Sequence, residues 1–215
     1  MKSRGILMTT VMVEALLRGT KTQTRRGAGL KKVNKSPSKY KFKHLFQLDG
    51  IWYACFTSPD SSEIIEEVKF PYGTIGDGLW VRETFSFRKR QEDWLDGEYL
   101  YKTDFFEKGL EDFKKKGNKW QPSLFMPRAA SRFDLEIVDI SCERLQDISE
   151  EDAIAEGVDF VEYPKAEFYN YLLADYTFCS PIESYRSLID LIHGKDFWES
   201  NPWVWVVKFK DVTKK

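Results

Sequence analysis

The most chemically varied stretch of the sequence runs from residue 19 to residue 26 and reads Gly-Thr-Lys-Thr-Gln-Thr-Arg-Arg. A lysine that is partly removed from water can lose its proton near neutral pH, and a threonine hydroxyl within its reach can then act as a nucleophile. Lys21 and Thr24 meet only if the backbone turns between them, because on a regular strand they point to opposite faces. A turn followed by a solvated polar strand is the alternative, and it is the favoured interpretation of this motif taken alone.

Arginines form a second group of candidate residues. Arg25 and Arg26 end the first motif, Arg82 lies in a strand-like pattern, and Arg128 and Arg132 flank a run of small residues. Guanidinium groups suit phosphates and carboxylates, and small residues let a ligand approach the backbone. All five arginines are therefore candidates for binding phosphate. For the pair at 128 and 132, surface salt bridges are the alternative, and a half-buried Arg82 needs a partner.

Glu156 lies at the end of a predicted helix over residues 149–156, which Ser149 caps and Gly157 follows. The other carboxylates of this helix lie near its start, where the helix dipole favours them, whereas a carboxylate at the end is mildly disfavoured. A residue that departs from a local preference can be there for function, and a tolerated surface glutamate is the alternative.

Other kinds of site find little support. The two histidines (His44 and His193) and three cysteines have no metal-ligand spacing, and so few histidines give no Ser-His-Asp arrangement. The glycines of residues 73–78 lead into a strand and lack the Lys-Ser/Thr of a phosphate-binding loop. Three tryptophans between residues 198 and 205 could stack on bases, but core packing is favoured. The sequence therefore predicts no metal and no cofactor.

Composition places the chain among globular proteins. It has 215 residues, of which 42% are hydrophobic, 31% charged and 15% aromatic, which excludes a disordered chain and a coiled coil. The length suits one domain. The longest apolar run, residues 203–207, is too short to cross a bilayer, and the first residues do not resemble a signal peptide. Three scattered cysteines give no disulfide framework, so we expect a cytoplasmic protein without membrane contact.

The net charge of -1 hides an uneven distribution. Residues 1–50 carry 12 basic and 2 acidic side chains, and the remainder carries 21 basic and 32 acidic ones. A basic segment attached to an acidic body suggests a polyanionic partner, because lysine and arginine release counterions from phosphates. A solvated loop that binds nothing is the alternative.

The hydrophobic pattern predicts short strands with a few helices. Strands are expected at 5–10, 22–26, 45–48, 51–56, 63–70, 79–87, 131–144 and 203–212, and helices at 11–18, 149–156 and 180–193. Residues 27–43 are expected to form a mobile insertion, and residues 88–120 an inserted hairpin and short helix. This mixture predicts an α+β fold, built as a small closed or nearly closed β-barrel with flanking helices.

Taken together, the motifs resemble the ASCH-domain family, which has a PUA-like fold, and look most like its branch in bacteriophages and prophages. The matching pieces are Gly19-x-Lys21-Thr22-x-Thr24-Arg25, Gly76-Asp77-x-Leu79-Trp80-Val81-Arg82-Glu83, Pro127–Arg132, Leu145–Gly157 and Asn201-Pro202-Trp203-Val204-Trp205. By this resemblance residues 1–215 form one domain, with insertions at 27–70 and 88–119.

The resemblance implies a β-barrel with a cleft that binds RNA, a nucleotide or a nucleoside. Some small family members are amidohydrolases that remove the acyl group from N-acylated cytidine. The matching residues here would be Thr24 as nucleophile, Lys21 as base and Glu156 as acid and base. We expect ligand binding in a basic cleft first, amide hydrolysis as the alternative, and protein binding through the acidic body as a third possibility. The oligomeric state is not predicted.

Overall fold

The computed structural model describes residues 2–89, 97–105, 107–115, 117–161, 167–173 and 176–213. Its strands are β1 (Ser3–Leu7), β2 (Gln23–Arg26), β3 (Lys41–Leu48), β4 (Ile51–Thr57), β5 (Ile64–Lys69), β6 (Gly78–Arg82), β7 (Phe85–Lys89), β8 (Gly97–Tyr101), β9 (Asp134–Arg144), β10 (Phe160–Val161), β11 (Glu167–Tyr169), β12 (Thr177–Phe178) and β13 (Trp203–Asp211). Its α-helices are α1 (Thr10–Arg18), α2 (Glu107–Lys115), α3 (Glu150–Ala155), α4 (Pro181–His193) and α5 (Asp196–Glu199). Short 3-10 helices are η1 (Val33–Lys35), η2 (Pro37–Lys39), η3 (Lys102–Asp104), η4 (Ser123–Phe125), η5 (Arg128–Ala130) and η6 (Leu145–Asp147).

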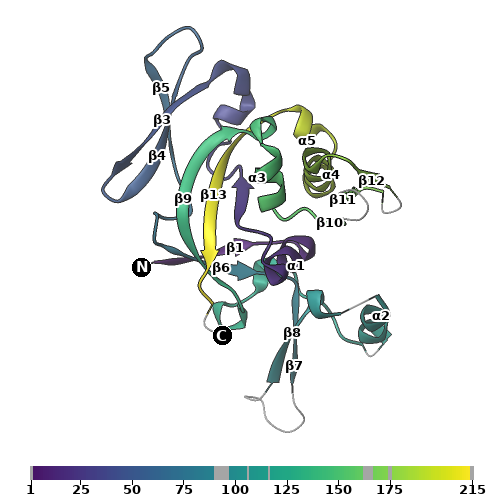
Figure 1. Cartoon of the computed structure of the whole chain (residues 1–215). Helices are drawn as coiled ribbons and strands as arrows, with labels where there is room; N and C mark the ends of the chain where they lie inside the picture. The colour runs from purple at the N-terminus through teal and green to yellow at the C-terminus, as the bar shows by residue number, and fades with distance from the viewer. Residues whose placement is uncertain are drawn as a thin grey trace.

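The fold is built on a curved central sheet whose strands lie in the order β1-β6-β9-β13-β2 (Figure 1). The β1–β6 pair is parallel and the other neighbours are antiparallel. Within the described residues, no ladder of hydrogen bonds joins β1 to β2, so these two strands are free edges. The α+β class is as predicted, but the sheet does not close into a barrel.

The final strand, β13, is buried on both faces. Trp205 lies edge-on to Phe70, with ring centroids 5.1 Å apart, and Trp203 lies edge-on to Phe56, also at 5.1 Å. Val204 faces the other way and packs beneath the helices. The tryptophans of this strand therefore belong to the core, as predicted.

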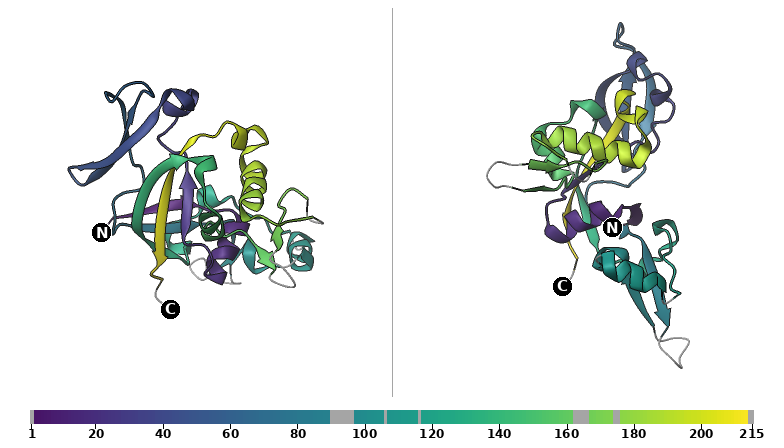
Figure 2. Two further views of the ribbon diagram at one scale, coloured as in Figure 1. Left: turned by 45° about the horizontal axis from the view of Figure 1, so that its top comes forward. Right: turned by 90° about the vertical axis from the view of Figure 1, so that its right-hand side faces the viewer.

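Helices cover the second face of the sheet near β13 (Figures 1 and 2). The layer is formed by α3, α4 and α5, and its apolar core includes Leu145, Tyr185, Ile189 and Trp198. Ser180 caps α4 by accepting a hydrogen bond from the Ile182 amide. This cap and the extent of α4 follow the sequence signals.

Residues 27–43 differ from the mobile loop that their composition predicted. Leu30 and Val33 are fully buried in the main core. The Asn34 side chain donates to the Trp203 carbonyl at 2.9 Å and accepts from the Trp203 amide at 2.7 Å. The buried side chains of Leu30 and Val33 and the amide of Asn34 therefore hold this otherwise polar segment against the start of β13.

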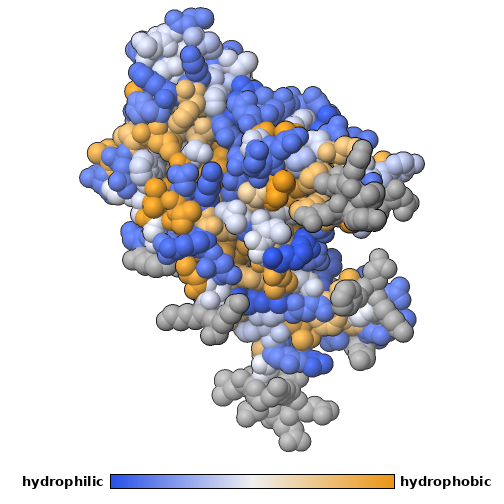
Figure 3. All heavy atoms as spheres, in the orientation of Figure 1, coloured by the Kyte–Doolittle hydropathy of each residue, from blue (hydrophilic) through white to orange (hydrophobic). Residues whose placement is uncertain are grey.

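A separate three-stranded sheet, β3-β4-β5, continues from this segment. Its first turn is Asp49-Gly50, and both residues have positive φ angles, 50° and 73°. Two successive residues of this kind fit a tight hairpin turn, which an Asp-Gly pair favours between the strands expected at 45–48 and 51–56. Hydrophilic residues cover much of the surface that these strands and the helices present in Figure 3, with hydrophobic patches between them.

The strand expected over residues 79–87 is two strands. β6 ends at Arg82 in the central sheet, while β7 pairs with β8 in a hairpin that projects from the body together with α2 (Figure 2). Between them lies Glu83, which is 2% exposed and pairs with Arg132. The apolar pattern continues through the break, so periodicity alone did not reveal it.

Candidate functional site

The start of β2 is held against the end of α3. The Thr22 amide donates to the Ala155 carbonyl at 2.9 Å. Gly157 follows with a φ of +91°, and a Cβ atom there would lie 2.5 Å from the Ala15 side chain and 3.0 Å from that of Lys21. A glycine is therefore required for Lys21 to approach this helix end so closely.

Lys21 and Glu156 are in direct contact. The Lys21 ammonium donates to the Glu156 carboxylate at 3.0 Å and to the Glu156 carbonyl at 2.6 Å. Both side chains are almost completely buried. Burial lowers the pKa of Lys21, although the Glu156 carboxylate acts in the opposite direction.

Thr24 lies on β2, three residues after Lys21, but does not join this pair. It is fully buried, opposite Val207 of β13. Its hydroxyl has no hydrogen-bond partner in the described part of the chain. The structure thus brings together two of the three predicted catalytic residues and leaves the third with an unpaired buried hydroxyl.

Arg25 is neutralised inside the protein. Its guanidinium contacts Glu143 at 2.6 Å, Asp152 at 2.7 Å and Glu156 at 3.2 Å. Burial alone would lower the pKa of Arg25, but the carboxylates of Glu156 and Glu143 raise it above its ordinary value. The group is a permanent cation held by three carboxylates, none of which the sequence suggested as its partner.

Two further predicted phosphate-binding arginines are also paired. Arg132 forms two bonds to the Glu83 carboxylate, at 2.8 and 3.0 Å, and one to Asp104 at 2.8 Å. Arg128 pairs with Asp134. Neither residue lines the two cavities described next, so the structure does not bring them to the other candidates.

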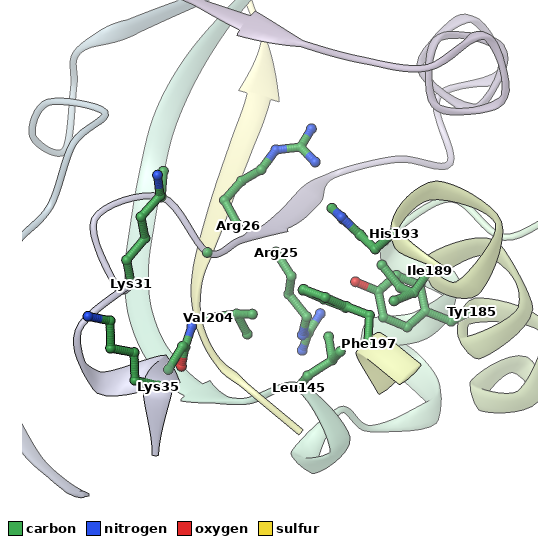
Figure 4. A pocket seen from close by; sticks show the side chains of 13 residues that line it. Arg25, Arg26, Lys31, Lys35, Leu145, Tyr185, Ile189, His193, Phe197 and Val204 are labelled. Carbon is green, nitrogen blue, oxygen red and sulfur yellow. The ribbon is translucent and has the colours of Figure 1, made fainter. Parts of the chain in front are cut away.

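The first cavity lies between the 27–35 segment and the helices, and its volume is about 480 Å³ (Figure 4). Its lining residues are Arg25, Arg26, Gly27, Ala28, Lys31, Asn34, Lys35, Leu145, Tyr185, Ile189, His193, Phe197 and Val204. Lys31 and Lys35 lie on one side, and Tyr185, Phe197 and His193 face them from the other. None of the lining residues is an aspartate or a glutamate.

Three cations of the first cavity have no carboxylate partner. Arg26 donates to the Leu7 carbonyl at 2.8 Å and contacts the Met12 sulfur. Within the described residues, Arg26, Lys31 and Lys35 form no ion pair. Their charge is therefore available to an anion that enters the cavity.

The opposite wall is aromatic and largely uncharged. The imidazole of His193 stacks on Phe197, with ring centroids 4.3 Å apart. Burial and then the charge of Arg26 lower the pKa of His193, so its ring is neutral at neutral pH. Burial raises the pKa of the Tyr185 phenol well above its ordinary value, which keeps the hydroxyl protonated.

The second cavity adjoins the first and has a volume of about 670 Å³. Its lining residues are Gly5, Ile6, Leu7, Met8, Thr9, Thr10, Met12, Arg26, Tyr72, Arg82, Thr84, Ser123, Ile192 and His193. Arg26 and His193 line both cavities. Of the five predicted arginines, Arg26 and Arg82 line the cavities and have no carboxylate partner in the part of the chain that the structure describes.

Sequence reasoning did not identify Lys31, Lys35, Tyr185, Phe197 or His193 as a group. The excess of basic residues between 18 and 43 was the only signal for the lysines. Tyr185 packs in the core while its hydroxyl points towards the cavity (Figure 4).

No cluster of histidine, cysteine, aspartate or glutamate in the described residues could hold a metal ion. Across the same residues, none of the helices has both the length and the apolar character needed to cross a membrane. Comparison of the chain with protein-family models, curated proteins and solved structures found no match.

Proposed function

We propose that the chain is an ASCH-type protein with a PUA-like fold, and that it binds RNA or a nucleotide in the first cavity. The observation that carries the proposal is the pairing of an aromatic wall with three unneutralised cations in a cavity without carboxylates. The curved mixed sheet with flanking helices and the ordered set of sequence motifs support the assignment to this fold.

The two sides of the first cavity suit the two parts of a nucleotide. A base can lie against the rings of Phe197 and His193, with the Tyr185 hydroxyl facing the same cavity, and stacking of this kind contributes about 1–3 kcal/mol per base. The phosphate then meets Lys31, Lys35 and Arg26, which are free to form charge-assisted hydrogen bonds. Both parts are bound without displacing an internal ion pair.

The proposal is tested by calorimetric titration with adenosine 5′-monophosphate and, as a control, adenosine. We expect the monophosphate to bind more tightly, because only it carries the phosphate. Its binding should weaken as salt is added, because salt screens the attraction between the phosphate and the exposed lysines Lys31 and Lys35. Absent binding, or binding that salt does not weaken, contradicts the proposal.

A second candidate function is hydrolysis of an N-acylated cytidine. The contact between Lys21 and Glu156, with the lowered pKa of Lys21, is the observation that favours it. In this reaction the Thr24 oxygen attacks the acyl carbon while neutral Lys21 takes the hydroxyl proton, and this proton passes through the Glu156 carboxylate to the cytidine nitrogen as the C–N bond breaks. Water then releases the acyl group from Thr24. Because all three residues are buried, the surrounding segments must open to admit a substrate.

This second candidate predicts release of cytidine from N-acetylcytidine by the purified protein. The rate should rise with pH as Lys21 loses its proton, at a lower pH than for a free lysine, because burial lowers its pKa. Lys21→Met should abolish turnover. Nucleotide binding without any turnover would exclude hydrolysis and leave the first proposal in place.

A further inference from the structure

The two cavities meet at the open edge of the central sheet. Arg26 ends β2, and its guanidinium donates at 2.8 Å to the Leu7 carbonyl, which ends β1. This side chain therefore spans the two free edges that strand pairing leaves unjoined. Because Arg26 and His193 line both cavities, the cavities lie on either side of one shared boundary.

The second cavity differs from the first in its chemistry. Apart from the His193 imidazole, its polar side chains carry hydroxyl groups or guanidiniums and are Thr9, Thr10, Thr84, Ser123, Tyr72, Arg26 and Arg82. Like the first cavity, it is lined by no aspartate or glutamate. Hydroxyls and guanidiniums together suit a sugar and its phosphate.

Arg82 is held in place by an aromatic ring and a backbone carbonyl, and no carboxylate of the described residues pairs with it. Its guanidinium lies 5.2 Å from the centre of the Trp80 ring and donates to the Leu124 carbonyl. Its Nε atom is buried and has no hydrogen-bond partner among the described residues. A Cβ atom on Gly5 would lie 2.7 Å from the Arg82 side chain, so the glycine leaves the space that Arg82 occupies.

We infer that the ligand is a single-stranded RNA segment of at least two nucleotides that runs from the first cavity to the second. This inference rests on the proposed function. One base lies against the aromatic wall of the first cavity, the phosphate that follows it lies on Arg26, and the next nucleotide enters the second cavity towards Arg82. Each cavity has a volume in the range of small-ligand sites, so each can hold one such unit.

The inference is tested by comparing adenosine 5′-monophosphate with single-stranded tetraadenylate. We expect the wild-type protein to bind tetraadenylate at least about tenfold more tightly, because a second nucleotide adds its own stacking and phosphate contacts. Arg82→Gln should reduce this ratio of affinities to within about threefold of unity. Arg88→Gln is the matched control, because Arg88 pairs with Glu98 on the projecting hairpin and should leave the ratio unchanged.

Thr84→Val is a second variant, which removes a hydroxyl from the second cavity and preserves the shape of the side chain. It should also lower the ratio, so the test does not depend on the folding of Arg82→Gln. If the monophosphate binds and tetraadenylate binds no more tightly, or if the ratio is unaffected by both variants, the inference is wrong and the proposed function stands. If neither ligand binds, the proposed function fails as well.

Discussion

Arg25→Met is expected to lower the free energy of unfolding by about 3–5 kcal/mol, the usual cost of removing one partner from a buried ion pair. The Arg25 side chain is 1% exposed and contacts Glu143, Asp152 and Glu156. Without it, three carboxylates converge from β9 and the α3 region with only Lys21 to offset them. Methionine fills much of the same volume, so most of the loss comes from the charge.

Urea denaturation measures this effect, and Arg128→Met provides the matched control. Arg128 also pairs with a carboxylate, that of Asp134, but both side chains are nearly half exposed. The control should therefore lose no more than about 1 kcal/mol. Equal losses in the two variants would show that the buried network of Arg25 contributes no more than an ordinary surface pair.

The double variant Lys31→Glu/Lys35→Glu is expected to weaken binding of adenosine 5′-monophosphate by at least about 100-fold. Each lysine can supply a hydrogen bond to a charged group, worth about 1.5–3 kcal/mol, and the introduced carboxylates repel the phosphate. Both positions are exposed, so the fold should be unaffected. Calorimetric titration gives the affinities.

Lys39→Glu/Lys41→Glu is the control for this second prediction. It changes the net charge of the protein by the same amount, on the same basic segment, but neither residue lines the first cavity. Its affinity should fall only slightly. A similar loss in both double variants would mean that general charge, rather than the cavity, attracts the nucleotide.

Much of the local structure could be predicted because its causes lie close together in the sequence. Ser180 and Gly194 delimit α4 through a cap and a terminating glycine, and Asp49-Gly50 specifies a tight turn. Such signals act over a few residues. They do not depend on what the rest of the chain does, which is why α1, α3, α4 and the α+β class were recovered.

The contacts that decide the site depend on residues far apart in the chain. Arg25 meets Glu143 across 118 positions and Glu156 across 131, and no local pattern in either segment indicates the other. An unpaired arginine and a neutralised one have the same sequence signature. For this reason Arg25, Arg128 and Arg132 were predicted to bind phosphate together with Arg26 and Arg82.

Lys21 and Glu156 were linked by the family resemblance, and Glu156 also by its unfavoured place at a helix end. The structure supplies the reason that this place is tolerated, because Lys21 and Arg25 both contact the carboxylate. Thr24 as a nucleophile stays a prediction. The aromatic wall of the first cavity could not be recognised, since core and cavity residues share the same face of α4.

The bonds between Asn34 and Trp203 have a thermodynamic consequence for recognition. Lys31 and Lys35 lie on either side of the buried Val33, next to an amide fixed to β13, so the backbone that carries the two amines is already ordered before a ligand arrives. Ligand binding then costs little conformational entropy of the backbone, so a few contacts are enough for measurable affinity. A free basic arm bearing the same charges would lose that advantage.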